Sequence, residues 1–183
     1  MDNLIEQIIE EITVGLKQIV PTSIYQASDM IREAPRIFIA GAGRSGLCIR
    51  AVGMRMMQTG KTVFIVGETI TPSIQAGDLL LVASGSGRTS TLMVVAEKAK
   101  HVGAKILLFT TDPESPIALL ADHVVVIPAP SLSSDAGKDG FESIQPMGTL
   151  FEQSLLIVCD SIVLRSMKDV DFSEMRERHA NLE

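Results

Sequence analysis

Short runs of apolar residues alternate along the chain with longer stretches in which apolar positions recur every three or four residues. Five of the short runs are rich in β-formers: RIFIA at 36–40, TVFIV at 62–66, LLLVA at 79–83, KILLFT at 105–110 and HVVVI at 123–127. Strands that are apolar on both faces and alternate with helices indicate a parallel sheet covered on both sides. Because crossover connections are right-handed, we predict an open five-stranded parallel sheet in a three-layer, doubly wound α/β/α sandwich.

Helical patterns flank this core. Residues 2–20 carry apolar residues three or four positions apart, which predicts an amphipathic N-terminal helix. A second helix is expected to start after Pro21, with Ser23 as its N-cap and Gln26 as the capping-box partner, and to end near Ala34-Pro35. A third, long helix is expected from about Gly148 to Met167. The apolar positions of the first helix are Ile5, Ile8, Ile9, Ile12, Leu16 and Ile19.

A chain of 183 residues has about the length of one domain. We expect a single domain over residues 1–183. Residues 128–146 are irregular, and a loop of this length in a compact domain is often functional. The expected parts are an N-terminal helical segment at 1–34, a parallel sheet core at 36–127, an active-site loop at 128–146, and C-terminal helices and a tail at 148–183.

Composition narrows the classes of function. The mean hydropathy of +0.29 is high, yet no run reaches the ~20 apolar residues of a membrane helix. We therefore expect the surplus apolar surface in the interfaces of a homo-oligomer, with the N-terminal helix in one of them. The net charge of −6 argues against a nucleic-acid or membrane binder. The first residues, MDNLIEQIIEE, lack a secretion pattern, so we expect a cytoplasmic protein.

Cysteine and histidine are scarce. Cys48 and Cys159 each lie in an apolar helical pattern, where they are expected as core residues. With two cysteines and three histidines in all, neither a disulfide framework nor a zinc site is expected. No metal is therefore assigned to the protein.

Two glycine- and serine-rich loops, GAGRSG at 41–46 and SGSGRT at 84–89, each follow a strand and open a helix. Glycine allows an anion to approach the backbone, and a helix N-terminus offers free N–H groups with a partial positive charge. The loops therefore predict a phosphate-binding site, in which the two arginines could pair with the phosphate or point to solvent. The candidate phosphate-binding residues are Gly43, Arg44, Ser45, Ser84, Gly85, Ser86, Gly87, Arg88 and Thr89.

The first loop also satisfies G-x-G-x-x-G, and Glu68 lies 22 residues past Gly46, where a ribose-binding acid would stand. An NAD(P)-binding Rossmann oxidoreductase is therefore an alternative. The second loop weighs against it, because a dinucleotide site uses one glycine turn whereas two loops suit one phosphate monoester. Either loop taken alone is also compatible with an ordinary glycine turn capped by serine.

The pairing of GAGRSG with SGSGRT, the stretch QPMGTLFEQ and the terminal HANLE closely resemble the sugar isomerase (SIS) domain family over essentially the whole chain. The resemblance implies a flavodoxin-like fold and a ketose–ketose isomerase that needs no cofactor. The implied reaction interconverts D-arabino-hex-3-ulose 6-phosphate and D-fructose 6-phosphate. It would follow a hexulose-phosphate synthase in the ribulose monophosphate route of formaldehyde fixation, and a dimer of dimers is expected. An aldose–ketose pentose phosphate isomerase shares the loops and remains an alternative. A non-catalytic sugar-phosphate sensor is fused to a DNA-binding module in related proteins, and the negative charge argues against that class here.

Such an isomerisation needs a base that moves a proton between C2 and C3. The resemblance places that base at Glu152, although Thr149 and Glu152 also have the spacing of a capping box. His179 is the candidate for a second proton-transfer group, because histidine titrates near neutrality. It lies in the tail, from which it could reach a neighbouring subunit or simply face solvent. Lys138, in the long loop, could cover the site or be a solvated lysine.

Overall fold

The computed structural model describes residues 3–130, 142–167 and 172–182. Within these residues, five strands form one parallel sheet in the order β2-β1-β3-β4-β5. This confirms the predicted open sheet, and the order is that of the flavodoxin-like class. The strands are β1 (Ile37–Gly41), β2 (Val63–Ile65), β3 (Leu79–Ala83), β4 (Lys105–Thr110) and β5 (His123–Val126).

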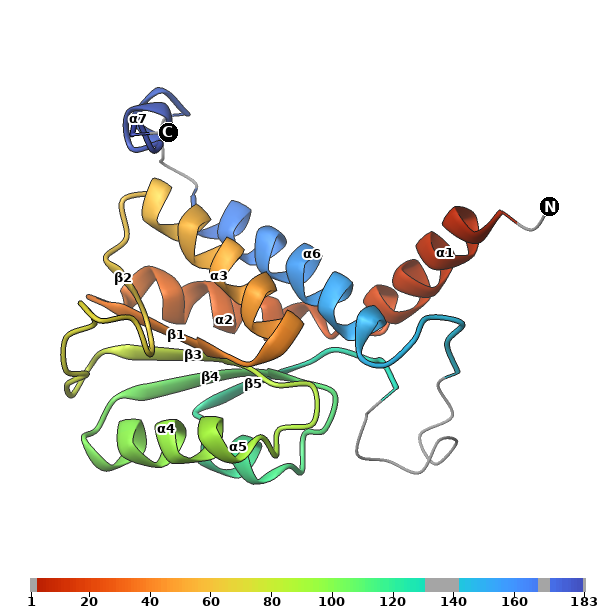
Figure 1. Cartoon of the computed structure of the whole chain (residues 1–183), viewed down its shortest axis with the longest axis horizontal. Helices are drawn as coiled ribbons and strands as arrows, with labels where there is room; N and C mark the ends of the chain where they lie inside the picture. The colour runs from red at the N-terminus through yellow and green to blue at the C-terminus, as the bar shows by residue number, and fades with distance from the viewer. Residues whose placement is uncertain (1–2, 131–141, 168–171, 183) are drawn as a thin grey trace.

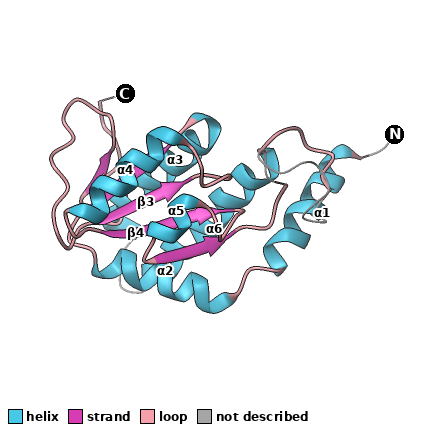
Figure 2. Cartoon of the chain, turned by 90° about the horizontal axis from the view of Figure 1, so that it is seen from below, coloured by secondary structure: helices cyan, strands magenta, loops and turns pink. Residues whose placement is uncertain are grey.

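Helices cover both faces of the sheet, so the three predicted layers are confirmed (Figures 1 and 2). One layer contains α2 (Pro21–Glu33), α3 (Gly43–Gln58) and α6 (Thr149–Ser166), and α1 (Leu4–Lys17) packs on α6 and extends away from the sheet. The opposite layer contains α4 (Ser90–His101) and α5 (Pro116–Leu120). The short α7 (Phe172–Glu177) lies beyond the C-terminal ends of α3 and α6.

The sheet separates two apolar cores. Leu79, Leu81 and Ala83 of β3 face α2, α3 and α6, whereas Leu80 and Val82 face α4 and α5. All five are at most 1% exposed, and complete burial of a leucine side chain stabilises the fold by about 1.5–3 kcal/mol. The double burial explains why these strands appear in the sequence as continuous apolar runs.

One local prediction was wrong, and one short helix was missed. Ser23 is not the N-cap of α2, because the helix begins earlier, with Val20 as N-cap and Pro21 in the first turn. The Ser23 hydroxyl instead donates to the carbonyl of Val124 and contacts His123 Nε2 at 3.2 Å, and so joins α2 to β5. The short α5 was not predicted at all, because five residues are too few to show a helical period.

The predicted amphipathic N-terminal helix is confirmed, but its apolar face is only partly covered. Ile12 and Leu16 pack against the core beside α6. Leu4, Ile5 and Ile9, nearer the N-terminus, are more than half exposed. No helix in the described part of the chain combines the length and the apolar character needed to cross a membrane.

Candidate active site

The two glycine loops meet at the point where the strand order reverses. β1 and β3 are neighbours in register, with Gly41 beside Ala83, so the loops that follow them start at the same edge of the sheet. This is the switch point at which ligands bind in doubly wound folds. A cavity of about 300 Å³ lies there. It is lined by Ala42, Gly43, Arg44, Ser45, Ala83, Ser84, Gly85, Ser86, Thr89, Leu92, Pro130, Gly148, Phe151 and Glu152.

The first loop brings the N-terminus of α3 to the cavity. A Cβ atom on Gly41 would lie 2.8 Å from the Cα of Gly46, so the helix can approach the strand this closely only because both residues are glycine. Gly43, the first residue of α3, has a φ of +55°, which favours glycine. Ala42 provides no side-chain cap, so the first N–H groups of α3 are available to a ligand.

The second loop is a closed turn held by its own serine. Gly87 N–H donates to the Ser84 carbonyl and to Ser84 Oγ, both at 3.1 Å. Ser84 Oγ also lies 3.3 Å from the hydroxyl of Thr89, the N-cap of α4. Ser84 is buried. Its hydroxyl holds the loop closed through these contacts, and the residue also lines the cavity.

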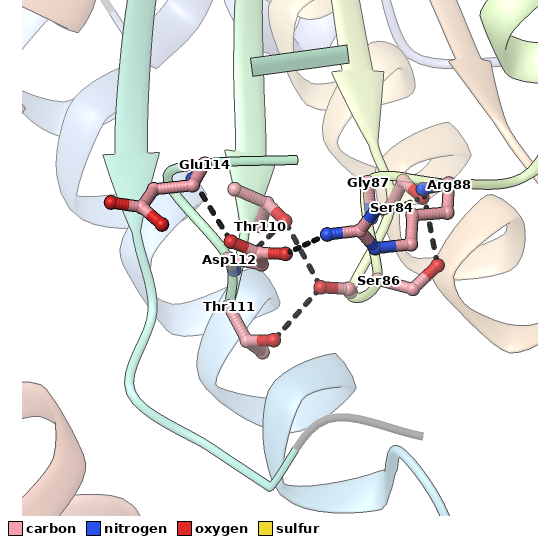
Figure 3. A network of polar contacts seen from close by, with 9 residues as sticks. Ser84, Ser86, Gly87, Arg88, Thr110, Thr111, Asp112 and Glu114 are labelled. Atoms are coloured by element: carbon pink, nitrogen blue, oxygen red, sulfur yellow. Dashed lines mark hydrogen bonds and ion pairs between the residues drawn. The ribbon is translucent and has the colours of Figure 1, made fainter. Parts of the chain in front are cut away.

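Two residues of the second loop lie outside the cavity lining. Gly87 has a φ of +59°, and a Cβ atom there would lie 2.0 Å from Ser115 Oγ, so the turn is pressed against the segment that follows β4. Arg88 extends towards the same segment, and its guanidinium forms a 2.8 Å ion pair with Asp112 (Figure 3). In this structure Arg88 is therefore directed to Asp112, and Arg44 is the arginine that lines the cavity.

Glu152 enters the cavity from α6. Its side chain is 11% exposed, and Oε2 accepts a 2.5 Å hydrogen bond from Nε of Arg44. The carboxylate raises the pKa of the Arg44 guanidinium. Cys48 lies one turn after Arg44, close enough for both charges to act on its thiol. Burial and the Glu152 carboxylate raise the pKa of this thiol, Arg44 lowers it, and the net effect is a raised pKa. A carboxylate and a guanidinium thus lie beside the two glycine loops.

The capping box suggested by Thr149 and Glu152 is absent. Gly148 is the N-cap of α6 without a side-chain cap, and the Thr149 hydroxyl donates to the Pro146 carbonyl at 2.6 Å. The Glu152 carboxylate is therefore directed to the cavity and to Arg44 instead of the N-terminus of its own helix.

The segment that leads into α6 is held by α1. The carboxylate of Glu11 accepts hydrogen bonds from Ser143 Oγ, Ile144 N–H and Gln145 Nε2, at 2.7–2.9 Å. Burial acts to raise the pKa of Glu11, but the three hydrogen bonds outweigh it and the pKa is lowered. Between this contact and α6, Met147 adopts a φ of +58°, a strained conformation of the kind found near functional sites.

His179 lies away from this cavity within the chain. It lines a different cavity of about 490 Å³, at the C-terminal ends of α3 and α6, together with Arg55, Asp160 and Met175. The N-terminus of α3 is at the Glu152 site, and sixteen residues of helix span about 24 Å. One chain therefore does not bring His179 and Glu152 together. Lys138 lies outside the described residues.

Several residues that line the site were not predicted as site residues from the sequence. Phe151 lies against Gly85, where a Cβ atom would be 3.4 Å from its ring. Pro130, Gly148 and Leu92 also line the cavity. Pro130 and Leu92 belong to no motif, whereas Gly148 and Phe151 lie in the QPMGTLFEQ stretch, which could have suggested them. Within the described ranges, no group of three His, Cys, Asp or Glu side chains is placed to hold a metal ion.

The dinucleotide alternative is not favoured. The dinucleotide-binding sheet has the strand order 3-2-1-4-5-6, whereas β1 here has β2 on one side and β3 on the other. Glu68, the candidate ribose ligand, instead forms a 2.6 Å ion pair with Arg50 on the exposed surface.

The sheet order and the paired loops define a class: doubly wound α/β domains that bind their ligand at the β1/β3 switch point. Within that class, the chain belongs to the SIS domain family, whose sequence profile matches residues 30–157.

Named relatives agree over nearly the whole chain. The 3-hexulose-6-phosphate isomerase of Mycobacterium gastri is 46% identical over 176 residues, which cover 95% of this chain and 87% of that protein. The 3-hexulose-6-phosphate isomerase of Bacillus subtilis is 42% identical, over 86% of this chain and 85% of that protein. A Methanococcus jannaschii protein, for which the function of 3-hexulose-6-phosphate isomerase was inferred from its crystal structure, superposes with a TM-score of 0.85 at 33% identity, covering 98% of both chains.

Proposed function

We propose that the protein is an isomerase that interconverts D-arabino-hex-3-ulose 6-phosphate and D-fructose 6-phosphate through an enediol(ate). The observation that carries the proposal is that Glu152 shares one cavity with both glycine loops. An isomerase of this kind must bind a phosphate at one end of the substrate and hold a base at the other. Relatives named 3-hexulose-6-phosphate isomerase, at 42–46% identity, support the choice of substrate.

The phosphate is assigned to the N-termini of α3 and α4. The first loop contributes Ser45 and the backbone of Gly43 to the cavity, and the second loop contributes Ser84, Ser86 and Thr89. Both helices lack a side-chain cap, so their terminal N–H groups and their dipoles favour an anion there. This arrangement allows an acidic protein to hold a dianionic substrate.

Glu152 is assigned as the base. Oε2 is engaged by Arg44, which leaves Oε1 to accept the proton from C2 of the hex-3-ulose. The electron pair of the C2–H bond then forms the C2=C3 double bond, and the C3 carbonyl oxygen becomes the enediol(ate) oxygen. Transfer of the O2 proton to O3 restores a carbonyl at C2 and leaves a hydroxyl at C3, and Glu152 returns its proton to C3. The ketone has moved by one carbon with no net change in protons or electrons.

His179 is proposed to serve the O2 and O3 proton transfer in the site of a neighbouring subunit. One observation supports a homo-oligomer: the exposed apolar row Leu4, Ile5 and Ile9 on α1. Because His179 lies away from the Glu152 cavity within one chain, it can take this role only from a neighbouring subunit. We propose a dimer of dimers as the assembly. In an equal mixture of Glu152→Gln and His179→Ala subunits, about a quarter of shared sites would be intact if dimers form at random. Mixing two inactive variants should therefore restore activity, and a mixture that stays inactive after subunit exchange would contradict a shared site.

The pathway follows from the substrate. A hex-3-ulose 6-phosphate arises when a synthase adds formaldehyde to a pentulose phosphate, so we place the protein after hexulose-phosphate synthase in the ribulose monophosphate route. We place the reaction in the cytoplasm, because charged sugar phosphates do not pass freely through a bilayer.

The decisive test is a coupled assay. Hexulose 6-phosphate is produced in situ by a synthase, and the formation of fructose 6-phosphate is followed. Ribulose 5-phosphate and arabinose 5-phosphate, supplied separately, test the aldose–ketose pentose phosphate isomerase. Turnover confined to the hexulose supports the proposal, and turnover confined to a pentose phosphate would replace it with the alternative.

A further inference from the structure

The carbonyl of Gly85, in the second glycine loop, is held by the end of β4. It accepts hydrogen bonds from Thr110 Oγ1 at 3.0 Å, Thr111 Oγ1 at 2.9 Å and Thr111 N–H at 3.0 Å. A carbonyl oxygen has two lone pairs, and here both are engaged by donors from the end of β4. These donors fix the direction in which the Gly85 carbonyl points. Figure 3 shows the side chains of Thr110 and Thr111 directed to the loop, with dashed lines for their two hydroxyl hydrogen bonds.

The orientation of the donors is itself fixed. Thr110 is fully buried, and its hydroxyl oxygen accepts a 3.2 Å hydrogen bond from Asp112 N–H while it donates to Gly85. A hydroxyl has a single hydrogen. Because the Thr110 oxygen accepts from Asp112 N–H, the hydroxyl hydrogen is directed to the Gly85 carbonyl. The backbone N–H of Ile117, in α5, holds the Gly87 carbonyl of the same loop in a similar way at 3.2 Å.

A trans peptide places its carbonyl and its N–H on opposite sides. The described chain has no cis peptide bond, so the N–H of Ser86 points away from the β4 turn when the Gly85 carbonyl points towards it. Gly85 and Ser86 line the cavity, whereas Thr110 and Thr111 do not. Within the described residues, the Ser86 N–H donates to no protein acceptor. Turning carbonyl oxygens away from the cavity and an N–H towards it is the arrangement that binds an anion.

We propose that Thr110 and Thr111 are positioning residues: they orient the Gly85–Ser86 peptide so that Ser86 N–H donates to the phosphate of the substrate. The inference deepens the proposed function, since it rests on the phosphate lying in this cavity. It does not depend on which sugar carries the phosphate or on whether turnover occurs.

Thr111→Val is the most direct test. It removes one hydroxyl hydrogen bond to Gly85 with little change in volume and leaves the Thr111 N–H bond in place. Losing a neutral hydrogen bond should weaken the binding of inorganic phosphate and of fructose 6-phosphate by about 2- to 12-fold. In the isomerase assay KM should rise while kcat changes little. Thr110→Val should act in the same direction, and Thr110→Ser, which keeps the hydroxyl, should recover most of the affinity.

Thr59→Val is the matched control. The Thr59 hydroxyl also donates to a carbonyl, that of Met56 at 2.7 Å, but at the far end of α3. This variant should bind phosphate as the wild type does. A general loss of stability would affect Thr59→Val and Thr111→Val alike, whereas the proposed role affects only Thr111→Val.

The backbone amide of Ser86 gives a readout that a merely structural role would not change. In deuterated, ¹⁵N-labelled wild-type protein, titration with inorganic phosphate should shift the Ser86 amide resonance together with those of residues 43–45. In Thr111→Val the Ser86 shift should shrink while the shifts at 43–45 persist. A saturable phosphate titration that leaves Ser86 unmoved in the wild type, or unchanged phosphate affinity in folded Thr111→Val, would overturn the proposal. Because phosphate alone is the probe, a failure of the isomerase assay leaves this result interpretable.

Discussion

Replacing Glu152 with glutamine separates the role of the side chain in catalysis from its role in the fold. Glutamine keeps the shape and one oxygen that can accept from Arg44 Nε, but it cannot take a proton from carbon. The structural loss is small, because Arg44 is 66% exposed in the pair and such ion pairs contribute about 0–1 kcal/mol. For a domain of this size, 1 kcal/mol changes the melting temperature by about 2–4 °C.

The expected loss of activity is much larger. General acid–base catalysis contributes about 10²- to 10⁴-fold to turnover, which is about 2.7–5.5 kcal/mol in the barrier. We therefore expect kcat of Glu152→Gln to fall by that factor in the coupled assay, while the affinity for fructose 6-phosphate changes little. In D₂O, wild-type turnover should introduce deuterium into the product, and the variant should lose this exchange together with turnover.

Glu68→Gln is the matched control. Glu68 also forms a short ion pair with an arginine, Arg50 at 2.6 Å, but on the exposed surface away from the cavity. It should keep wild-type kcat and nearly wild-type stability. If Glu152→Gln isomerises at close to the wild-type rate, Glu152 is not the base. A loss of activity that accompanies a large drop in melting temperature would also refute the reasoning, because the structure assigns Glu152 only a weak stabilising contact.

Other expectations concern binding and stability. Ser45→Ala should weaken fructose 6-phosphate binding by about 10- to 150-fold, the worth of one hydrogen bond to a charged group; calorimetry showing unchanged affinity would place the phosphate elsewhere. Burial acts to raise the pKa of Asp78, but hydrogen bonds from Arg36 and from Gln75 N–H outweigh it, and the pKa is lowered. The stabilisation from Asp78 is therefore present above its unfolded pKa and lost as pH falls through the lower folded value. Asp78→Asn should cost about 1.5–3 kcal/mol in urea unfolding at pH 7, the worth of hydrogen bonds to a charged group. The difference from wild type should shrink below about pH 4; a difference that stays constant with pH would contradict this.

The sequence was sufficient for the sheet and for the edge at which the site lies. Strands such as LLLVA are apolar on both faces, and this signal needs no knowledge of distant contacts. Predictions from the local sequence were wrong where the side chain forms a hydrogen bond with a residue that is distant in the chain. Ser23 has the chemistry of an N-cap, but β5 uses its hydroxyl. Thr149 and Glu152 have capping-box spacing, but Arg44, more than a hundred residues away in the chain, binds the carboxylate.

The residues that hold the second loop in place also could not be predicted from the sequence, but the reason is different. Thr110 and Thr111 end an ordinary buried strand, and their role depends on the parallel pairing of β4 with β3, which brings them beside Gly85. The position of His179 also follows from packing, because α7 lies against the C-terminal end of α3. Motifs in the sequence located the glycine loops and Glu152 that line the cavity, and only the assembled fold located the groups that hold the second loop in place.

The strand order also sets a constraint during synthesis of the chain. β1 lies between β2 and β3, so the edge of β1 that pairs with β3 stays open until residue 83 has been made, even after β2 has been added at residues 63–65. At about 5–20 residues per second, the ribosome takes about 2–8 s to extend the chain from residue 41 to residue 83. The core under α6 waits still longer, because Phe151, Leu155 and Cys159 are added near the end of translation. A nascent chain of this protein therefore exposes unpaired strand edges and an open apolar face for seconds, the interval in which chaperone binding or aggregation competes with folding.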